Sequence, residues 1–466
     1  MNEMGASVDA VGIVLAAGRG SRMRSRKPKP LHRAAGKELI RYPIELLLAC
    51  GVERIVVVIS PENRDAIRGL IGDSVQYAVQ PAPNGTGDAL ACGLAALSGS
   101  PSVVVALSGD TPLVRPDSVR KLIDEHRGNA GRCMTILSAT DVFAGDLGRI
   151  QRSSAKEPVG AGPVTGIVEA ADLPDATPGP AEVNTGVYCF GGLWLAETIG
   201  SIRPAASGEF YLTALAAIAA DSGDDVAALP IALADEAMGV NDRKQLAAAE
   251  TVLRDRINLH WMESGVTIID TATTYIDADV KIGCDTVLLP NTMLSGETVI
   301  GEDCEVGPNA TVRDTVIGDR CRIIASVLEE SGVESDVDIG PYSHLRPGSL
   351  IETGVHLGNY VEVKNSRIGA DTAAGHFSYL GDADIGVGVN IGAGTITCNY
   401  DGVDKHRTVI GDGAFIGSDT MLVAPVTVGD GAATGAGAVV IRDVPEARRA
   451  VGVPARLLPP PEKGQG

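Results

Sequence analysis

The order of hydrophobic and polar positions divides the chain into two halves with different periods. In the first half, short and continuous β-branched runs occupy residues 11–18, 54–60 and 102–110. Such runs are typical of strands that are buried on both faces of a mostly parallel sheet. Stretches with helical spacing alternate with them, at 42–51, 87–97 and 116–126. This alternation predicts an α/β domain.

The second half has a hydrophobic period of six. Aliphatic residues recur at six-residue intervals at Ile282, Leu288, Leu294, Ile300, Val306 and Val312, and the frame returns at Ile385 and Ile391 and at Ile416, Leu422, Val428 and Thr434. A hexapeptide repeat predicts short strands that stack into a parallel β-helix, with three hexads in each coil. Residues 241–265 predict one long amphipathic helix between the halves.

Composition and charge narrow the classes of function. The chain has 466 residues and a formal net charge of -20, which disfavours nucleic acid as a general partner. No run of eighteen apolar residues occurs, and the first ten residues lack the features of a signal peptide, so we expect a cytoplasmic protein without a membrane span. The eight cysteines include no C-x-x-C pair, which predicts reduced, mostly buried thiols and argues against a structural zinc site.

A basic segment stands out against the acidic background. Residues 15–32, "LAAGRGSRMRSRKPKPLH", carry seven basic side chains and no acidic one. Gly18 and Gly20 follow a predicted strand, where backbone N–H groups can approach a phosphate, with Arg22 and Lys29 in reach of the same anion. The alternative is an ordinary turn with a solvated basic face.

An aspartate ends the third buried run. Asp110 follows "LSG" at the carboxyl end of that strand, where open α/β sheets place their ligands. A carboxylate that faces a basic, glycine-rich loop suggests Mg²⁺ between protein and phosphate. The alternative is a turn or N-cap aspartate before Thr111 and Pro112.

Several motifs together resemble one family. L-A-A-G-x-G-[ST]-R-M with P-K-x-L-H, then "NGTGDA", "GDTPL", "GIVE", "VNTGVY", "GEFYLT" and "GVNDR" are similar to the sugar-1-phosphate nucleotidyltransferases. With the repeat domain behind them, they resemble the bifunctional bacterial enzymes that join an N-acetylglucosamine-1-phosphate uridyltransferase to a glucosamine-1-phosphate N-acetyltransferase. The resemblance covers nearly the whole chain.

The resemblance implies a fold and a division into domains. We expect an α/β Rossmann-like nucleotidyltransferase domain at 1–243, a linker helix at 244–264, and a left-handed parallel β-helix acetyltransferase domain at 265–466. It also implies a homotrimer in which neighbouring subunits complete each acetyl site.

The resemblance further implies the residues of the uridyltransferase site. Arg22 and Lys29 would be catalytic, and Asp110 and Asn241 would hold Mg²⁺. The nucleotide and UDP-sugar residues would be Leu15, Ala16, Ala17, Gly18, Lys29, Gln80, Gly85, Thr86, Ser108, Gly109, Asp110, Gly148, Glu169, Asn184 and Asn241. In the implied reaction, the phosphate of N-acetylglucosamine 1-phosphate attacks the α-phosphorus of UTP and expels pyrophosphate.

Residues 375–407 interrupt the six-residue frame with side chains that a β-helix coil does not need for packing. His376, Tyr379, Asn390, Asn399, Tyr400 and Lys405 gather there, and interruptions on one face of a solenoid are where binding sites are usually built. By resemblance, His376 is the general base that removes a proton from the glucosamine amine as it attacks acetyl-CoA. Arg346, Lys364, Tyr379 and Asn390 would bind glucosamine 1-phosphate, and Ala393, Asn399, Tyr400, Ser418 and Ala436 would line the acetyl-CoA site.

The sequence departs from the family pattern at several positions. Asn84, Asp88, Leu147 and Ala214 stand where leucine, histidine, tyrosine and aspartate are usual, and Gly452 stands where an arginine often contacts coenzyme A. Arg448, Arg449 or Arg456 would be the substitutes for that arginine, unless they form a solvated surface.

Several hypotheses about the function of the chain therefore remain. We expect acetylation of glucosamine 1-phosphate, then uridylation to UDP-N-acetylglucosamine, a precursor of cell-wall polymers. The alternatives are an acetyltransferase with an impaired uridyltransferase half, a monofunctional nucleotidyltransferase with a structural β-helix, and a regulatory subunit in which both sites have decayed.

Overall fold

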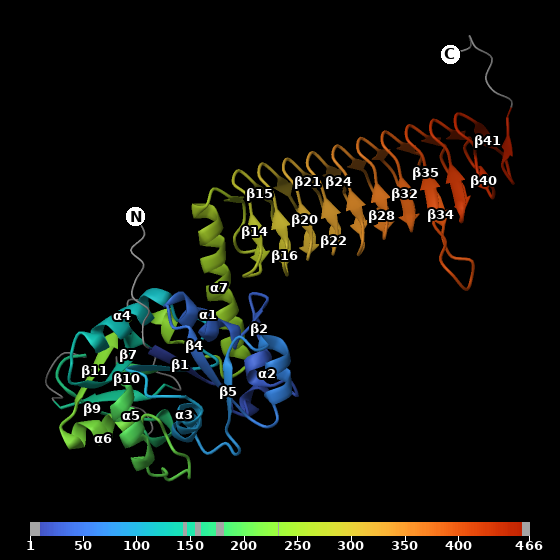
Figure 1. Cartoon of the computed structure of the whole chain (residues 1–466). Helices are drawn as coiled ribbons and strands as arrows, with labels where there is room; N and C mark the ends of the chain where they lie inside the picture. Colours follow the sequence, from blue (N-terminus) through green and yellow to red (C-terminus); the bar gives the residue numbers. More distant parts are fainter. Residues whose placement is uncertain (1–9, 143–146, 154–159, 174–180, 232, 459–466) are drawn as a thin grey trace. The chain divides into compact units, whose positions relative to one another are not determined.

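The computed structural model describes residues 10–142, 147–153, 160–173, 181–231 and 233–458. The chain forms two compact units, Met1–Leu253 and Arg254–Gly466, whose elements are labelled in Figure 1. The boundary between the units falls inside helix α7, Arg243–Glu263. In the described residues, no helix is long and apolar enough to cross a membrane.

The first unit is built on a nine-stranded sheet with the main order β11-β7-β10-β6-β1-β4-β5, and β8 and β9 pair beside β10 (Figure 1). The strands are β1 Ala10–Leu15, β4 Arg54–Ile59, β5 Gln76–Val79, β6 Val103–Ser108, β7 Arg132–Val142, β8 Arg149–Arg152, β9 Val164–Val168, β10 Ala181–Gly191 and β11 Asp225–Pro230. Strands β6, β1, β4 and β5 are parallel neighbours, whereas β10 runs antiparallel to β6 and β7. The predicted α/β class is confirmed, and β1, β4 and β6 coincide with the three predicted strands.

Helices cover both faces of this sheet. They are α1 Arg41–Ala49, α2 Arg64–Ile71, α3 Thr86–Ala95, α4 Pro116–Arg127, α5 Gly192–Thr198 and α6 Ala214–Ser222. Successive side chains of β1 point to opposite faces: Ala10 and Val14 pack with α1, α2 and α4, and Val11 and Ile13 pack with α3, α5 and α6. Burial on both faces explains why the strand sequences are continuous apolar runs.

The second unit is a left-handed parallel β-helix with three sheets of stacked strands. In the described residues the sheets have twelve, ten and nine strands, beginning at β12 Thr267–Ile268, β13 Tyr275–Ile276 and β14 Lys281–Ile282, and each sheet takes every third strand of the chain up to the last coils. The six residues Ile282 to Val312 of the first hexad series are all buried. The predicted β-helix and its frame are confirmed.

The corners and the cysteines follow the same stacking. Left-handed backbone conformations recur at corners, as at Asn291 and Asn309 (φ 59° each), where asparagine and aspartate are tolerated better than most residues. All eight cysteines are free. Cys133, Cys189, Cys304 and Cys321 are buried, three others are half-buried and Cys284 is exposed, so the predicted burial of the thiols holds for half of them and fails outright at Cys284.

Candidate functional sites

A cavity of about 800 Å³ lies where β1 and β6 end in the first unit. Of the residues predicted for the uridyltransferase site, those that line it are 15–18, Arg22, Lys29, Gln80, Gly85, Thr86, 108–110, Glu169 and Asn241. They come from five separate stretches of the chain, 15–29, 80–86, 108–110, 169 and 241. The sheet edge at the carboxyl ends of parallel strands is therefore the place where the motifs meet.

Three polar side chains meet at one point of this cavity. The Lys29 ammonium forms an ion pair with the Asp110 carboxylate and donates a hydrogen bond to Asn241 Oδ1 at 2.8 Å. The backbone N–H of Val240 donates to the carbonyl of Asp110 at 2.9 Å, which fixes the segment before α7 against the end of β6. A carboxylate and an amide oxygen that converge on one cation fit Mg²⁺, which binds few protein oxygens and shares the rest with substrate phosphates.

The glycine-rich loop after β1 is shaped by its neighbours. Gly20 has φ +60°, and a Cβ there would lie 2.5 Å from Lys29 Cβ, so the left-handed glycine lets Lys29 approach the loop. A Cβ at Gly18 would meet no atom within 4 Å, so the space beside it is open. The Asn63 amide donates to the carbonyl of Ala16 at 2.8 Å and holds the start of the loop.

One part of the cavity lining comes from the segment around Phe210, for which the sequence predicted no role. The N–H of Phe210 donates to the carbonyl of Asn84, and the N–H of Gly87 donates to the carbonyl of Phe210, both at 2.7 Å. This pairing brings Glu209 and Tyr211 into the lining. The motif "GEFYLT" was the available signal for both residues.

Two predicted sugar residues lie beside the cavity and not in its lining. The Asn184 amide donates to Tyr188 Oη at 2.6 Å, and Asn184 Oδ1 accepts the N–H of Gly186 at 3.0 Å. The N–H of Asn184 donates to the carbonyl of Gly148 at 2.9 Å, and a Cβ on Gly148 would lie 3.5 Å from Glu169 Oε2. The wall that carries Glu169 is thus supported by both residues.

The departures from the family pattern have different surroundings. Leu147 packs beside a small buried cluster of Ala139, Val183 and Ala237. Ala214 packs against the core under α6. Asn84 is exposed, whereas Asp88 accepts a hydrogen bond from Gln80.

The second group of predicted residues lies on the β-helix around the corner that carries His376. His376 is exposed and follows β30, Ala373–Ala374. Ala393, Ser418 and Ala436 occupy the equivalent corner on the next three coils: the N–H of Asp419 donates to the carbonyl of Ala393, and the N–H of Gly437 donates to that of Ser418. The predicted acetyl-CoA residues therefore continue one edge of the β-helix away from His376.

Cations gather beside Tyr379 on the ten-stranded sheet. Tyr379 lies in β31, Ser378–Gly381, next to β28, Val361–Lys364. The Lys364 ammonium lies close enough to lower the pKa of Lys405, and Arg346 donates to Glu362 Oε1 at 2.9 Å. The like charges raise the local positive potential, which suits the binding of a phosphate.

A buried carboxylate anchors the loop that carries Tyr400 and Lys405. Asp382 accepts hydrogen bonds from the amides of Asn365 (2.6 Å) and Asn399 (2.5 Å). Burial alone would raise the pKa of Asp382, but these two bonds and the nearby lysines hold it below its usual value. Residues 399–407 project from the β-helix between β34, Ile396–Cys398, and β35, Thr408–Ile410 (Figure 1). Neither Asp382 nor Glu362 carries a motif signal of its own, so the sequence alone did not indicate them.

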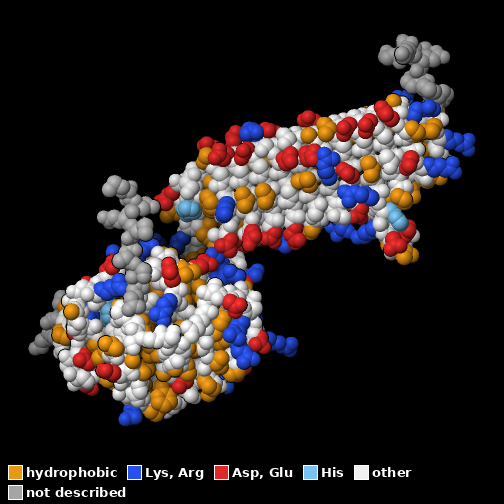
Figure 2. Space-filling view, in the orientation of Figure 1, with side chains coloured by type: hydrophobic (Ala, Val, Ile, Leu, Met, Phe, Trp, Pro, Cys, Tyr) orange, Lys and Arg blue, Asp and Glu red, His pale blue; other side chains and the backbone are white. Residues whose placement is uncertain are grey.

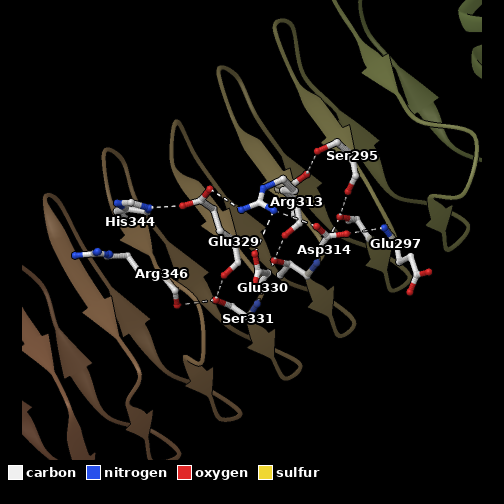
Figure 3. A network of polar contacts seen from close by, with 12 residues as sticks. Ser295, Glu297, Arg313, Asp314, Glu329, Glu330, Ser331, His344 and Arg346 are labelled. Carbon is white, nitrogen blue, oxygen red and sulfur yellow. Dashed lines mark hydrogen bonds and ion pairs between the residues drawn. The ribbon is translucent and has the colours of Figure 1, made fainter. Parts of the chain in front are cut away.

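A network of charged side chains occupies the coils before Arg346 (Figure 3). Arg313 bonds to Glu329 at 3.0 Å, and His344 Nε2 lies 3.0 Å from the other oxygen of Glu329. The Ser331 hydroxyl donates to the carbonyl of Arg346 at 3.2 Å. On the face shown in Figure 2, acidic side chains gather along the edges of this unit, and basic side chains are more frequent toward its C-terminal end. Arg346 thus lies between this network, in which acidic and basic side chains are paired, and the two lysines Lys364 and Lys405.

The last coil has a backbone conformation at position 452 that disfavours an arginine. Gly452 has φ +93° in the turn between β41, Arg449–Val451, and β42, Arg456–Leu457, where a side chain is strained. Arg448 donates to the carbonyl of Leu458 at 2.9 Å. Arg449 and Arg456 are exposed, so they are the freer of the three candidates.

Comparison with known proteins agrees with this two-part architecture. The family model of the MobA-like NTP transferase domain matches residues 12–178, and that of the bacterial transferase hexapeptide (six repeats) matches 279–314 and 407–442. A bifunctional protein GlmU of Pelobacter propionicus is 44% identical over 448 residues, which cover 95% of each chain. The chain belongs to the family of bifunctional GlmU proteins. Relatives of the same name from a Geobacillus species and from Heliobacterium modesticaldum are 41% and 43% identical over 94% of each chain.

Membership in the GlmU family bears on the alternatives. The matches run through both units, so they give no support to a monofunctional enzyme with a merely structural β-helix. Nor do they favour a subunit with decayed sites, and the residues at the centres of both predicted sites are present.

Proposed function

We propose that the chain catalyses two steps of UDP-N-acetylglucosamine synthesis. The β-helix unit acetylates glucosamine 1-phosphate with acetyl-CoA, and the α/β unit transfers UMP from UTP to the N-acetylglucosamine 1-phosphate that results. Membership in the family of bifunctional GlmU proteins supports the pair of activities. The observation that carries the uridyl transfer is the convergence of Lys29, Asp110 and Asn241 in a large cavity.

The uridyl transfer needs alignment and charge neutralisation more than a protein base. An oxygen of the sugar phosphate attacks the α-phosphorus of UTP, the bond to the β-phosphate breaks, and pyrophosphate leaves. Lys29 and Arg22 would neutralise the phosphate charge, and the N–H groups of the 15–20 loop would orient the phosphates. Asp110 and Asn241 would hold Mg²⁺, which when bound supplies further charge neutralisation at the phosphates.

Two groups of residues that line the cavity or lie beside it would take part in substrate selection. Gln80, Gly85 and Thr86 would contact the uracil, while Glu169, backed by Gly148 and Asn184, would face the amino sugar. Glu209 and Tyr211 join this group because they line the same cavity.

Acetyl transfer would take place at the His376 corner. The glucosamine nitrogen attacks the thioester carbonyl, coenzyme A leaves as the thiol, and His376 removes the amine proton. Arg346, Lys364 and Lys405 would bind the phosphate, with Tyr379 and Asn390 beside it. Acetyl-CoA would lie along Ala393, Ser418 and Ala436, with Asn399 and Tyr400 contributed by the projecting loop.

Further proposals concern assembly and location. We propose a homotrimer in which neighbouring β-helices complete the acetyl sites, and size-exclusion chromatography with light scattering would then give three times the 48.0 kDa chain mass. The eight free cysteines support a reducing compartment, and we propose the cytoplasm.

The uridyltransferase proposal is tested by pyrophosphate release from UTP, Mg²⁺ and N-acetylglucosamine 1-phosphate. Lys29→Ala should lower the rate by at least about a hundredfold, whereas Arg64→Ala, which removes an exposed cation of α2, should leave it unchanged. Equal rates for Lys29→Ala and the wild type would contradict the proposed role of the cavity.

A further inference from the structure

The side-chain amide of Gln80 is held in one orientation by two partners. Gln80 is buried, lines the large cavity, and its backbone N–H donates to the carbonyl of Ile59 at 2.9 Å. Its Nε2 donates to the carbonyl of Gly85 at 3.0 Å and to Asp88 Oδ2 at 2.8 Å. Both hydrogens of the amide nitrogen are therefore used inside the protein.

The chemistry of these partners decides which atom of the amide is which. A carboxylate and a carbonyl accept hydrogen bonds and donate none, so only the nitrogen of Gln80 can face them. Among the residues that the structure describes, none donates a hydrogen bond to Gln80 Oε1. The group that Gln80 keeps for a ligand is therefore an acceptor.

We propose that Asp88 is a positioning residue that makes the base site select uracil over cytosine. The inference rests on the proposed function, because it takes Gln80 to contact the pyrimidine of the nucleoside triphosphate. Uracil presents an N3–H donor, which Gln80 Oε1 can accept. Cytosine has a lone pair at N3, which would face the same oxygen, and Gln80 cannot turn its amide without losing both protein bonds.

The place of Asp88 suits this role. It lies in the first turn of α3, where the helix dipole favours a carboxylate. It is absent from the lining of the cavity, so it acts on the base through Gln80. Gly85, the other partner, has φ +109°, and a Cβ there would lie 2.5 Å from the carbonyl oxygen of Phe210, which makes its carbonyl a fixed acceptor.

The test compares two substitutions of similar size in the full chain. Asp88→Asn keeps an oxygen that can accept from Gln80, whereas Asp88→Leu removes it. The measured quantity is kcat/KM for UTP divided by kcat/KM for CTP, from pyrophosphate release with N-acetylglucosamine 1-phosphate. We expect Asp88→Leu to lower this ratio by about tenfold or more, and Asp88→Asn to change it by less than about threefold.

A second comparison separates positioning from general damage. In a Gln80→Ala background the Asp88→Leu substitution should no longer change the ratio, because the amide that it orients is gone. An unchanged ratio for Asp88→Leu, or an equal change in the Gln80→Ala background, would overturn the inference.

The inference can also be judged apart from the proposed reaction. If the wild type releases no pyrophosphate from UTP, the proposed function fails, and competition between UTP and CTP for binding to the wild type and to Asp88→Leu still decides the inference. Preference for UTP in the wild type that shrinks in Asp88→Leu supports it, and equal preference in the two proteins overturns it.

Discussion

At the residue scale, the two proposed sites rest on charges that are balanced only in part by the protein. In the first site, Lys29 forms an ion pair with Asp110 and donates a hydrogen bond to Asn241. The lysine could therefore bind a phosphate while the carboxylate binds the metal ion. In the second, Lys364 and Lys405 lie together. Lysine is thus the proposed anion-binding residue type in both units, and in the second site two lysines lie close together.

The lysine pair predicts a pH dependence of phosphate binding. The ammonium of Lys364 lowers the pKa of Lys405, so Lys405 loses its charge at a lower pH than an ordinary lysine. The affinity for glucosamine 1-phosphate should therefore begin to decline at a lower pH than the pKa of an ordinary lysine, about 10.4. In Lys364→Met the affinity should be weaker at pH 7, but its decline should begin at higher pH. Calorimetric titrations over a range of pH test the prediction, and an unshifted decline would contradict it.

A buried histidine predicts acid sensitivity of the first unit. Burial lowers the pKa of His126 to about 4, and its Nδ1 lies 3.0 Å from Thr135 Oγ1. Below about pH 6.5 the unfolded chain takes up a proton that the folded protein refuses, so stability is lost as the pH falls toward 4. Between pH 7 and pH 4.5, the free energy of unfolding should fall by about 2 kcal/mol more in the wild type than in His126→Gln. Urea unfolding at the two pH values measures it, and equal pH dependence in both proteins would refute the assignment.

At the scale of elements, the loop after β1 combines two glycines with different tasks. Gly20 is required by its left-handed φ and by the contact with Lys29, whereas Gly18 has open space beside it. Gly20→Ala should lower the unfolding free energy by about 1–3 kcal/mol, while Gly18→Ala should leave the melting temperature unchanged and raise the KM for UTP. Thermal melts and KM values for the pair test this assignment. A melting temperature that falls equally in both variants would contradict it.

The Asp382 carboxylate ties the base of the projecting loop to the neighbouring coils of the β-helix. Asp382 bonds to Asn365 and Asn399, and its carbonyl accepts the N–H of Thr408 at the other end of the loop. Asp382→Leu should loosen the loop and leave the buried amide of Asn399 with only its long bond to Tyr379 Oη at 3.4 Å, at a cost of about 1–3 kcal/mol. Faster amide hydrogen exchange across 399–407, with an unchanged rate in the coils 282–312, is the expected result. Uniform or unchanged exchange would show that other contacts hold the loop.

Sequence reasoning predicted elements better than it predicted contacts between them. The positions of β1, β4 and β6 and the buried hexads from Ile282 onward follow from local periodicity, which survives without knowledge of the rest of the chain. The meeting of Lys29 with Asn241 joins residues far apart in the sequence, and only the family resemblance indicated it. Glu209 and Tyr211 line the cavity because Phe210 forms hydrogen bonds with Asn84 and Gly87. The role of Asp382 depends on the stacking of coils. No local sequence pattern therefore predicts these residues.

At the scale of the whole molecule, each unit carries one proposed site, and the repeating architecture of that unit determines where the site lies. The α/β sheet gathers its site at the carboxyl ends of strands, and the β-helix builds its site where the hexad frame is interrupted. Each site can therefore be disabled by a substitution that leaves the core of the other unit untouched. This independence makes the claim of two activities in one chain testable in a single reaction mixture.

The most direct test of that claim is the formation of UDP-N-acetylglucosamine from glucosamine 1-phosphate, acetyl-CoA, UTP and Mg²⁺, followed by mass spectrometry. The wild type should form the product. His376→Ala should form none until N-acetylglucosamine 1-phosphate is added, and should then match the wild-type rate of uridyl transfer. Product from glucosamine 1-phosphate with folded His376→Ala, or no product from the wild type even with the acetylated sugar, would contradict the account.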